Sequence, residues 1–285
     1  MNIKNIKNIN VLESLNLRVR NLLLVFIYFI FLFFLISGLI YSQGENNNQT
    51  ILYYQLESVE NISNNDKNDK KGDNNKDIVK SVLDFYISKD KIRLNAKQFS
   101  TNQSGNENQL ISDSSIILEE NDKKVNLYIL DNLEKYYAIV NQENIPDVLQ
   151  NDEKIKEFIY SVEIKKEGNE KVGDFNCEKY AIFYKGQKAM ELFTIDYKSL
   201  ISSKDFESFK NLYLESNLYK QFGQYFNELG NKLSSKISPE SFIVKYNFYE
   251  NNNIIITTIL KEIKFIKYDK KYFDIPTNYK KIEFK

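Results

Sequence analysis

Side chains capable of chemistry are few in this chain of 285 residues. The chain contains no His, and Cys177 is its only Cys. These absences exclude Ser-His-Asp and Cys-His catalysis, zinc sites built from His or several Cys, and a disulfide within the chain. Carboxylate chemistry is the main possibility that remains, because Asp and Glu together number 39.

Several carboxylates fall near turns or at the ends of predicted strands, where an acid pair of the kind used by glycosidases could form. Nothing in the sequence fixes the separation between any two of them. We therefore interpret them as solvated surface charge and expect no enzymatic activity. They are Glu119, Glu120, Asp131, Glu134, Asp196 and Glu240.

Metal and cofactor sites are not indicated either. Asp66, Asp69 and Asp73 share one polar stretch, but interleaved lysines oppose calcium binding and the spacing is not that of an EF-hand. No Gly-rich phosphate-binding loop is present, so we expect no cofactor. Without a His to lower its pKa, Cys177 is interpreted as a small hydrophobic residue of the core.

The composition indicates a folded domain without affinity for nucleic acid. Apolar residues make up 42% of the chain, and 20 Phe and 20 Tyr provide material for a core. Basic and acidic residues both number 39, so no electrostatic footprint for nucleic acid or anionic lipid exists.

The N-terminal segment, residues 1–42, has the marks of a secretory signal peptide. Arg18 and Arg20 precede an uninterrupted apolar run from Leu22 to Ile36, and small residues follow. We expect cleavage after Ser42 and a mature protein in the periplasm or cell envelope. Retention as an N-terminal anchor stays open, because Leu22 to Tyr41 reaches the length of about 20 residues that spans a bilayer.

Residues 43–285 are predicted to form a single domain, because no repeat or composition shift divides them. Alternating apolar residues and turn signals predict many antiparallel strands, with hairpins about Lys89-Asp90, Asn121-Asp122 and Lys185-Gly186. Between the first two strands, the polar tract 61–77 is predicted to be a flexible loop or a disordered insert.

Two helices interrupt the strands. A short one is predicted after Pro146. A longer one falls between Lys198 and Leu233, where apolar residues recur at spacings of three and four. We expect its apolar face to cover the sheet and to contact any ligand that lies beneath it; the residues proposed for this contact are Leu218, Phe222, Phe226 and Leu229.

The fold class that follows is α+β: a large curved antiparallel sheet with helices on one face. In such a fold the apolar stripe of the longer helix needs an apolar partner, and the sheet face is the only large one available.

Four segments carry a family resemblance: the meander around KVNLYILDNLEKYYAIV, the stretch Gly173 to Tyr180, the strand MELFTID, and the closing stretch Tyr272 to Tyr279. Together they resemble an uncharacterised family of exported bacterial proteins, similar in layout to the LolA/LolB superfamily of lipoprotein carriers. The resemblance implies an unclosed half-barrel whose concave face is covered by helices. The motif here departs in one respect, since Gly173 precedes Cys177 by four positions instead of three.

Three functions remain open on this basis. The first is a non-enzymatic envelope protein that binds a lipid or a lipoprotein acyl chain in the half-barrel. The second is a structural or protein-interaction module of the envelope without a small ligand. The third is a carboxylate-dependent hydrolase, which would require two facing carboxylates in a cleft. Membrane contact is expected only through the N-terminal segment.

Overall fold

A computed structural model describes residues 50–63, 76–101, 108–121, 124–141, 157, 160–214, 232, 235–238 and 240–282. The predicted signal segment and the predicted ligand-contacting residues Leu218, Phe222, Phe226 and Leu229 lie outside these ranges. In the part of the chain that is described, no helix has the length and apolar character needed to cross a membrane.

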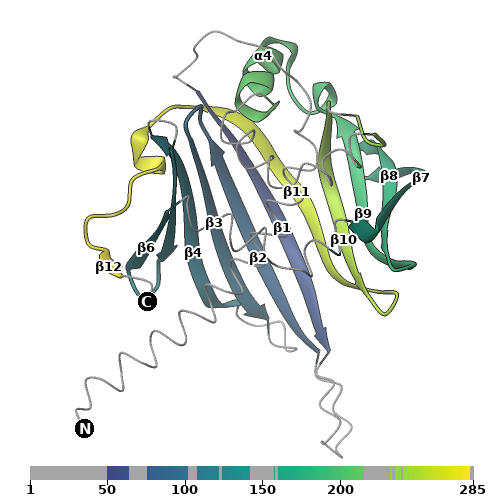
Figure 1. Ribbon diagram of the computed structural model, residues 1–285, viewed down its shortest axis with the longest axis horizontal. Coiled ribbons are helices and arrows are strands. Elements are labelled where there is room, and N and C mark those ends of the chain that lie inside the picture. The colour runs from purple at the N-terminus through teal and green to yellow at the C-terminus, as the bar shows by residue number, and fades with distance from the viewer. Residues whose placement is uncertain are drawn as a thin grey trace, which may run out of the picture.

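The described residues form one sheet of twelve strands. Figure 1 shows how its strands lie side by side in a curved, open arrangement. Their bounds are β1 Thr50–Ser63, β2 Lys76–Ile87, β3 Lys91–Thr101, β4 Asn108–Asn121, β5 Lys124–Asp131, β6 Tyr136–Asn141, β7 Val162–Val172, β8 Phe175–Tyr184, β9 Gln187–Asp196, β10 Ser241–Glu250, β11 Asn253–Lys267 and β12 Lys280–Ile282.

The sheet is built from two antiparallel meanders. Its strand order is β12-β6-β5-β4-β3-β2-β1-β11-β10-β9-β8-β7, so the pairing of β1 with β11 joins the two meanders. Among the described strands, only β12 runs parallel to its neighbour, β6. The two edges, β12 and β7, do not pair with each other, and the prediction of a large unclosed antiparallel sheet is confirmed.

The predicted hairpins have local causes. Lys185 and Gly186 both have positive φ, as do Asn251 and Asn252 in the turn between β10 and β11. Two successive residues with positive φ match the twist of the flanking strands, and Gly and Asn adopt this conformation most readily. The first hairpin is longer than expected, because β1 continues to Ser63 and β2 begins at Lys76. Residues 64–75 of the predicted loop lie outside the described ranges.

Helical structure is sparse in the described residues. The segment after β9 forms η2 Tyr197–Ser199, η3 Ser203–Asp205, the single-turn helix α4 Phe206–Phe209 and the π-helical turn η4 Lys210–Leu214; a further 3₁₀ turn, η6 Lys270–Tyr272, follows β11. Tyr160 and Ser161 are helical, and β7 begins directly after them at Val162. Helices covering a concave face are thus not confirmed.

The main hydrophobic core lies on one face of the sheet, which we call the core face. Leu52, Tyr54, Leu83, Phe85 and Leu94 belong to it, at alternating positions of neighbouring strands. The other side of the sheet is called the outer face. Side chains at the intervening positions, such as those of Arg93 and Glu191, point to it, because successive strand residues alternate between faces.

Candidate functional site

An aromatic chain connects α4 to the core face. The Phe209 ring stacks on Tyr197 at a centroid distance of 4.7 Å and meets Phe242 edge-on at 6.0 Å. Phe242 lies edge-on to Tyr54 at 5.6 Å, and Tyr54 stacks on Phe85 at 4.5 Å. These rings belong to α4, η2, β10, β1 and β2. The short helix is therefore fixed to the sheet at the end where β1 begins (Figure 1).

The apolar core face continues from this aromatic chain across both meanders. Buried members of the same cluster come from β4 and β5 on one side and from β8 and β9 on the other; they include Ile116, Leu127, Ile182 and Leu192. The edges of the sheet stay apart. The described residues thus form one wide, buried apolar face on a sheet that does not close.

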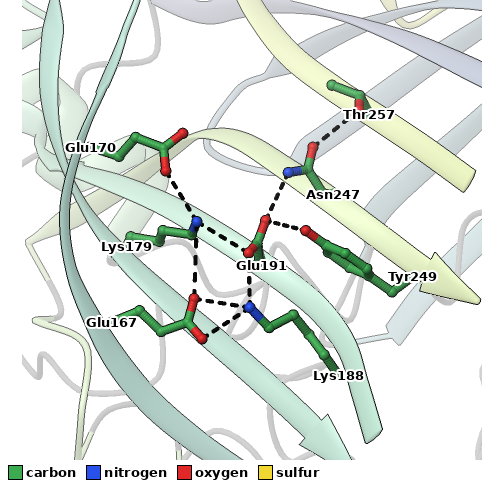
Figure 2. Close-up of polar contacts among 8 residues, drawn as sticks. All are labelled: Glu167, Glu170, Lys179, Lys188, Glu191, Asn247, Tyr249 and Thr257. Atoms are coloured by element: carbon green, nitrogen blue, oxygen red, sulfur yellow. Dashed lines mark hydrogen bonds and ion pairs between the residues drawn. The ribbon is translucent and has the colours of Figure 1, made fainter. Parts of the chain in front are cut away.

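The outer face carries a buried carboxylate in the middle of β9. Glu191 is only 4% exposed. Its Oε2 accepts hydrogen bonds from Tyr249 Oη at 2.6 Å and Asn247 Nδ2 at 3.0 Å. Its Oε1 lies 3.0 Å from Lys188 Nζ and 3.2 Å from Lys179 Nζ. Both oxygens are therefore occupied from three strands, β8, β9 and β10, as Figure 2 shows.

Further charged and polar groups surround this carboxylate. Lys179 also pairs with Glu170 at 3.0 Å, and Lys188 pairs with Glu167 at 2.9 Å. On the other side, Thr257 Oγ1 donates to Asn247 Oδ1 at 3.0 Å and orients that amide. The network therefore reaches from β7 to β11 (Figure 2).

Burial raises the pKa of Glu191, but the hydrogen bonds from Tyr249, Asn247 and the two lysines outweigh it and lower the pKa to about 2. A carboxyl group in this state carries no proton to donate near neutral pH. With both oxygens occupied, it is also a poor base or nucleophile. The arrangement differs from a glycosidase pair, which requires one carboxyl group with a raised pKa.

The carboxylates singled out in the sequence take part in local contacts. Glu119 pairs with Lys91 at 2.6 Å, and Glu240 pairs with Lys198 at 2.8 Å. Asp131 accepts hydrogen bonds from the backbone of a turn, at Leu133 and Glu134. Asp196 accepts one from the backbone N–H of Lys198.

These carboxylates belong to separate parts of the fold, since Glu119 and Asp131 lie in β4 and β5 while Asp196 ends β9. In the described ranges, no cluster of three or more acidic or Cys residues could hold a metal ion.

Cys177 is buried, and its Sγ lies 3.8 Å from the carbonyl oxygen of Phe175. Burial raises the pKa of its thiol. Both observations agree with its interpretation as a core residue, because a reactive thiol requires a lowered pKa.

A second polar network on the outer face holds the C-terminal segment, which we define as Tyr268 to Tyr279. Arg93 Nη1 donates to the carbonyl oxygens of Tyr272 and Asp274 at 3.2 and 3.3 Å. Its Nε donates to Asn95 Oδ1 at 2.6 Å, and its Nη2 donates to Ser115 Oγ at 3.2 Å. Burial lowers the pKa of the Arg93 guanidinium.

The aromatic residues of this segment complete the attachment. Tyr272 stacks on Tyr86 with centroids 4.9 Å apart, and Tyr279 Oη donates to Asn132 Oδ1 at 2.9 Å. Phe273 of the same segment is buried. The segment leads into β12, which pairs with β6 at the sheet edge.

Comparison with protein families finds one match over most of the domain. Residues 75–279 match the model described as a domain of unknown function, DUF4412. The chain belongs to the DUF4412 family. The expectation of an uncharacterised family is thereby confirmed, and the match includes both the Glu191 network and the C-terminal segment.

Two solved structures are distantly similar to this DUF4412 chain. An uncharacterised conserved protein from Thermus thermophilus is 8% identical, with 81% of this chain and 90% of that one covered, at a TM-score of 0.39. A DUF1329 family protein from Desulfovibrio piger is 8% identical, with 80% and 91% covered, at a TM-score of 0.26. No curated protein matches the chain.

Proposed function

We propose that this protein is a non-enzymatic component of the cell envelope that holds a lipid or lipoprotein acyl chain against the core face of its sheet. The observation that carries this proposal is the continuous apolar face of a sheet whose edges stay apart. Sites for apolar ligands are lined mainly by hydrophobic and aromatic side chains, with few polar groups.

The chemistry of the outer face supports a role without catalysis. Glu191 is the one described carboxyl group whose pKa is lowered as far as about 2. All of its contacts hold its carboxylate in place in the ionised form. The predicted ligand contacts of Leu218, Phe222, Phe226 and Leu229 remain part of the proposal. They would add a helical face to the aromatic chain around Phe209.

The test is extraction of lipid from the full-length protein, purified from its native envelope without delipidation. We expect mass spectrometry to find about one acyl-chain lipid per protein. Phe222→Ala should reduce that amount while costing well below the about 3 to 5 kcal/mol expected of a core Phe, because its ring would border the ligand. The proposal would be contradicted if the purified protein carried no lipid and Phe222→Ala lost the full stability expected for truncation of a core Phe.

In that case the second candidate, a structural or interaction module of the envelope, would be favoured. The tight attachment of the C-terminal segment to the sheet is the observation on its side, because it gives the outer face a fixed shape.

Export is a separate part of the proposal and has its own test. N-terminal sequencing of the exported protein should give a mature chain that begins close to Gln43. Retention of residues 22–36 in membrane-bound protein would replace cleavage by anchoring. Soluble protein confined to the cytoplasm would contradict export altogether.

A further inference from the structure

The core face changes character along the strands. It is apolar where β1 begins, at Leu52, Tyr54 and Leu56. The next two residues of β1 on the same face are Ser58 and Glu60. Ser58 lies four residues beyond Tyr54, which corresponds to roughly 13 Å along an extended strand. The polar part of this face is therefore well separated from α4.

Ser58 belongs to a row of polar side chains that crosses six strands in register. Each member faces the next across the ladder: Tyr246 to Thr258, Thr258 to Ser58, Ser58 to Ser81, Ser81 to Gln98, and Gln98 to Ser112. We call these six residues the polar row. Directly paired residues point to the same face of a sheet, so the row continues the core face.

Two observations support this placement. Thr258 Oγ1 donates to Ser58 Oγ at 3.1 Å, which requires both side chains on one face. On β2 and β3 the residues two positions before or after the row are Leu83 and Ala96, which are buried in the core cluster. Thr258 and Tyr246 are also buried, whereas Ser58, Ser81, Gln98 and Ser112 are half-buried. The row thus lies where the core gives way to solvent.

Glu60 lies one step further along this face. Its partners in the ladders are Val79 and Ile256, which provide no charge. Its carboxyl group makes no ion pair or hydrogen bond with the described residues, and burial raises its pKa. A half-buried carboxylate in such surroundings gains from a cation or a hydrogen-bond donor that approaches it.

We propose that the polar row and Glu60 bind the head group of a single-chain amphiphile that carries a primary amine, with its alkyl chain along the core face toward α4. This inference rests on the proposed function and specifies its ligand. Charge complementarity to Glu60 selects the amine, and the hydroxyl and amide groups of the row supply further hydrogen bonds. A fatty-acid carboxylate would instead meet a like charge.

The test compares three probes with the same chain length: hexadecylamine, palmitate and monopalmitoyl glycerol. Their dissociation constants for the full-length protein are measured by native mass spectrometry below the micellar concentrations. We expect the amine to bind about tenfold more tightly than palmitate. Glu60→Gln should remove that preference and leave monopalmitoyl glycerol binding unchanged.

The matched control is Glu57→Gln. Glu57 is on the same strand but faces outward, where it pairs with Lys80 at 3.2 Å and Lys261 at 3.7 Å. This variant should keep the preference for the amine. Equal binding of amine and palmitate, or an equal loss of preference in both variants, would overturn the head-group assignment while leaving an acyl-binding function in place. Failure of all three probes to bind would overturn the proposed function as well.

Discussion

The outer face holds two half-buried or buried charges in opposite halves of the sheet, and they are compensated in different ways. Glu191 in the β7–β11 half receives two lysine ammonium groups and two neutral donors. Arg93 in the β2–β6 half is surrounded by neutral oxygens, two of them backbone carbonyls. Within the described residues, no carboxylate pairs with Arg93 directly.

The difference shows what each network holds together. Glu191 joins strands that are already neighbours in the ladder, so its contacts strengthen pairing that exists without them. Arg93 reaches a segment about 180 positions away in the sequence, which has no ladder of its own before β12. We therefore expect Glu191 to contribute to global stability and Arg93 to the docking of one segment.

The largest expected effect is that of Glu191→Ala. It would leave Asn247 without its acceptor and would remove a shared partner of Lys179 and Lys188. Breaking a buried ion pair costs about 3 to 5 kcal/mol, and urea unfolding of the full-length protein measures this loss.

Glu167→Ala is the matched control, because Glu167 pairs with the same Lys188 but is more exposed. Exposed pairs contribute at most about 1 kcal/mol. Equal losses of unfolding free energy in the two variants would show that the burial of Glu191 adds nothing to the stability of the fold.

Lowering the pH should reproduce part of the stability loss expected for Glu191→Ala. The pKa of Glu191 in the folded protein is lowered to about 2, from an ordinary value of 4.5. A lowered carboxyl pKa stabilises the fold above the unfolded pKa, and this contribution is lost as pH falls toward the folded value. The full shift corresponds to about 3 kcal/mol, of which we expect about 2 because water reaches the lysines.

The measurement is the stability difference between wild type and Glu191→Gln as a function of pH. It should be constant between pH 7 and about 5 and shrink between about 4.5 and 3. A difference that stays constant down to pH 3 would mean that Glu191 is not ionised in the way its contacts indicate.

Local patterns were sufficient to predict most of the sheet. The alternation in KSVLDFYIS and the turn signal at Lys185-Gly186 depend on residues close in sequence, and the structure has the strands and hairpins where these patterns place them. Such features are encoded within a few residues, so no tertiary information was needed.

The functional groups were harder to predict because they depend on register between distant strands. Glu191 occupies an outward position of MELFTID and is typical of a solvated residue until Lys179 and Asn247 are brought beside it. The polar row has no signal in any single strand, since each strand contributes one ordinary polar residue to it. Arg93 depends on a segment near the other end of the chain.

The smallest effect expected from this comparison is also the most local. Arg93→Met keeps much of the side-chain length but removes the donors to Tyr272 and Asp274. Hydrogen bonds to charged groups contribute about 1.5 to 3 kcal/mol, and we expect a loss of stability near the lower limit because the freed carbonyls can turn to water.

Lys264→Met is the control for Arg93→Met, since Lys264 pairs with Glu262 at an exposed site. Hydrogen exchange separates local from global opening. In Arg93→Met, the Lys280 amide, which donates to the Lys135 carbonyl oxygen at 2.9 Å, should exchange faster while amides of β8 to β10 keep their protection. Equal acceleration across the whole sheet would show that Arg93 supports the fold as a whole, and the contrast with Glu191 would then be wrong.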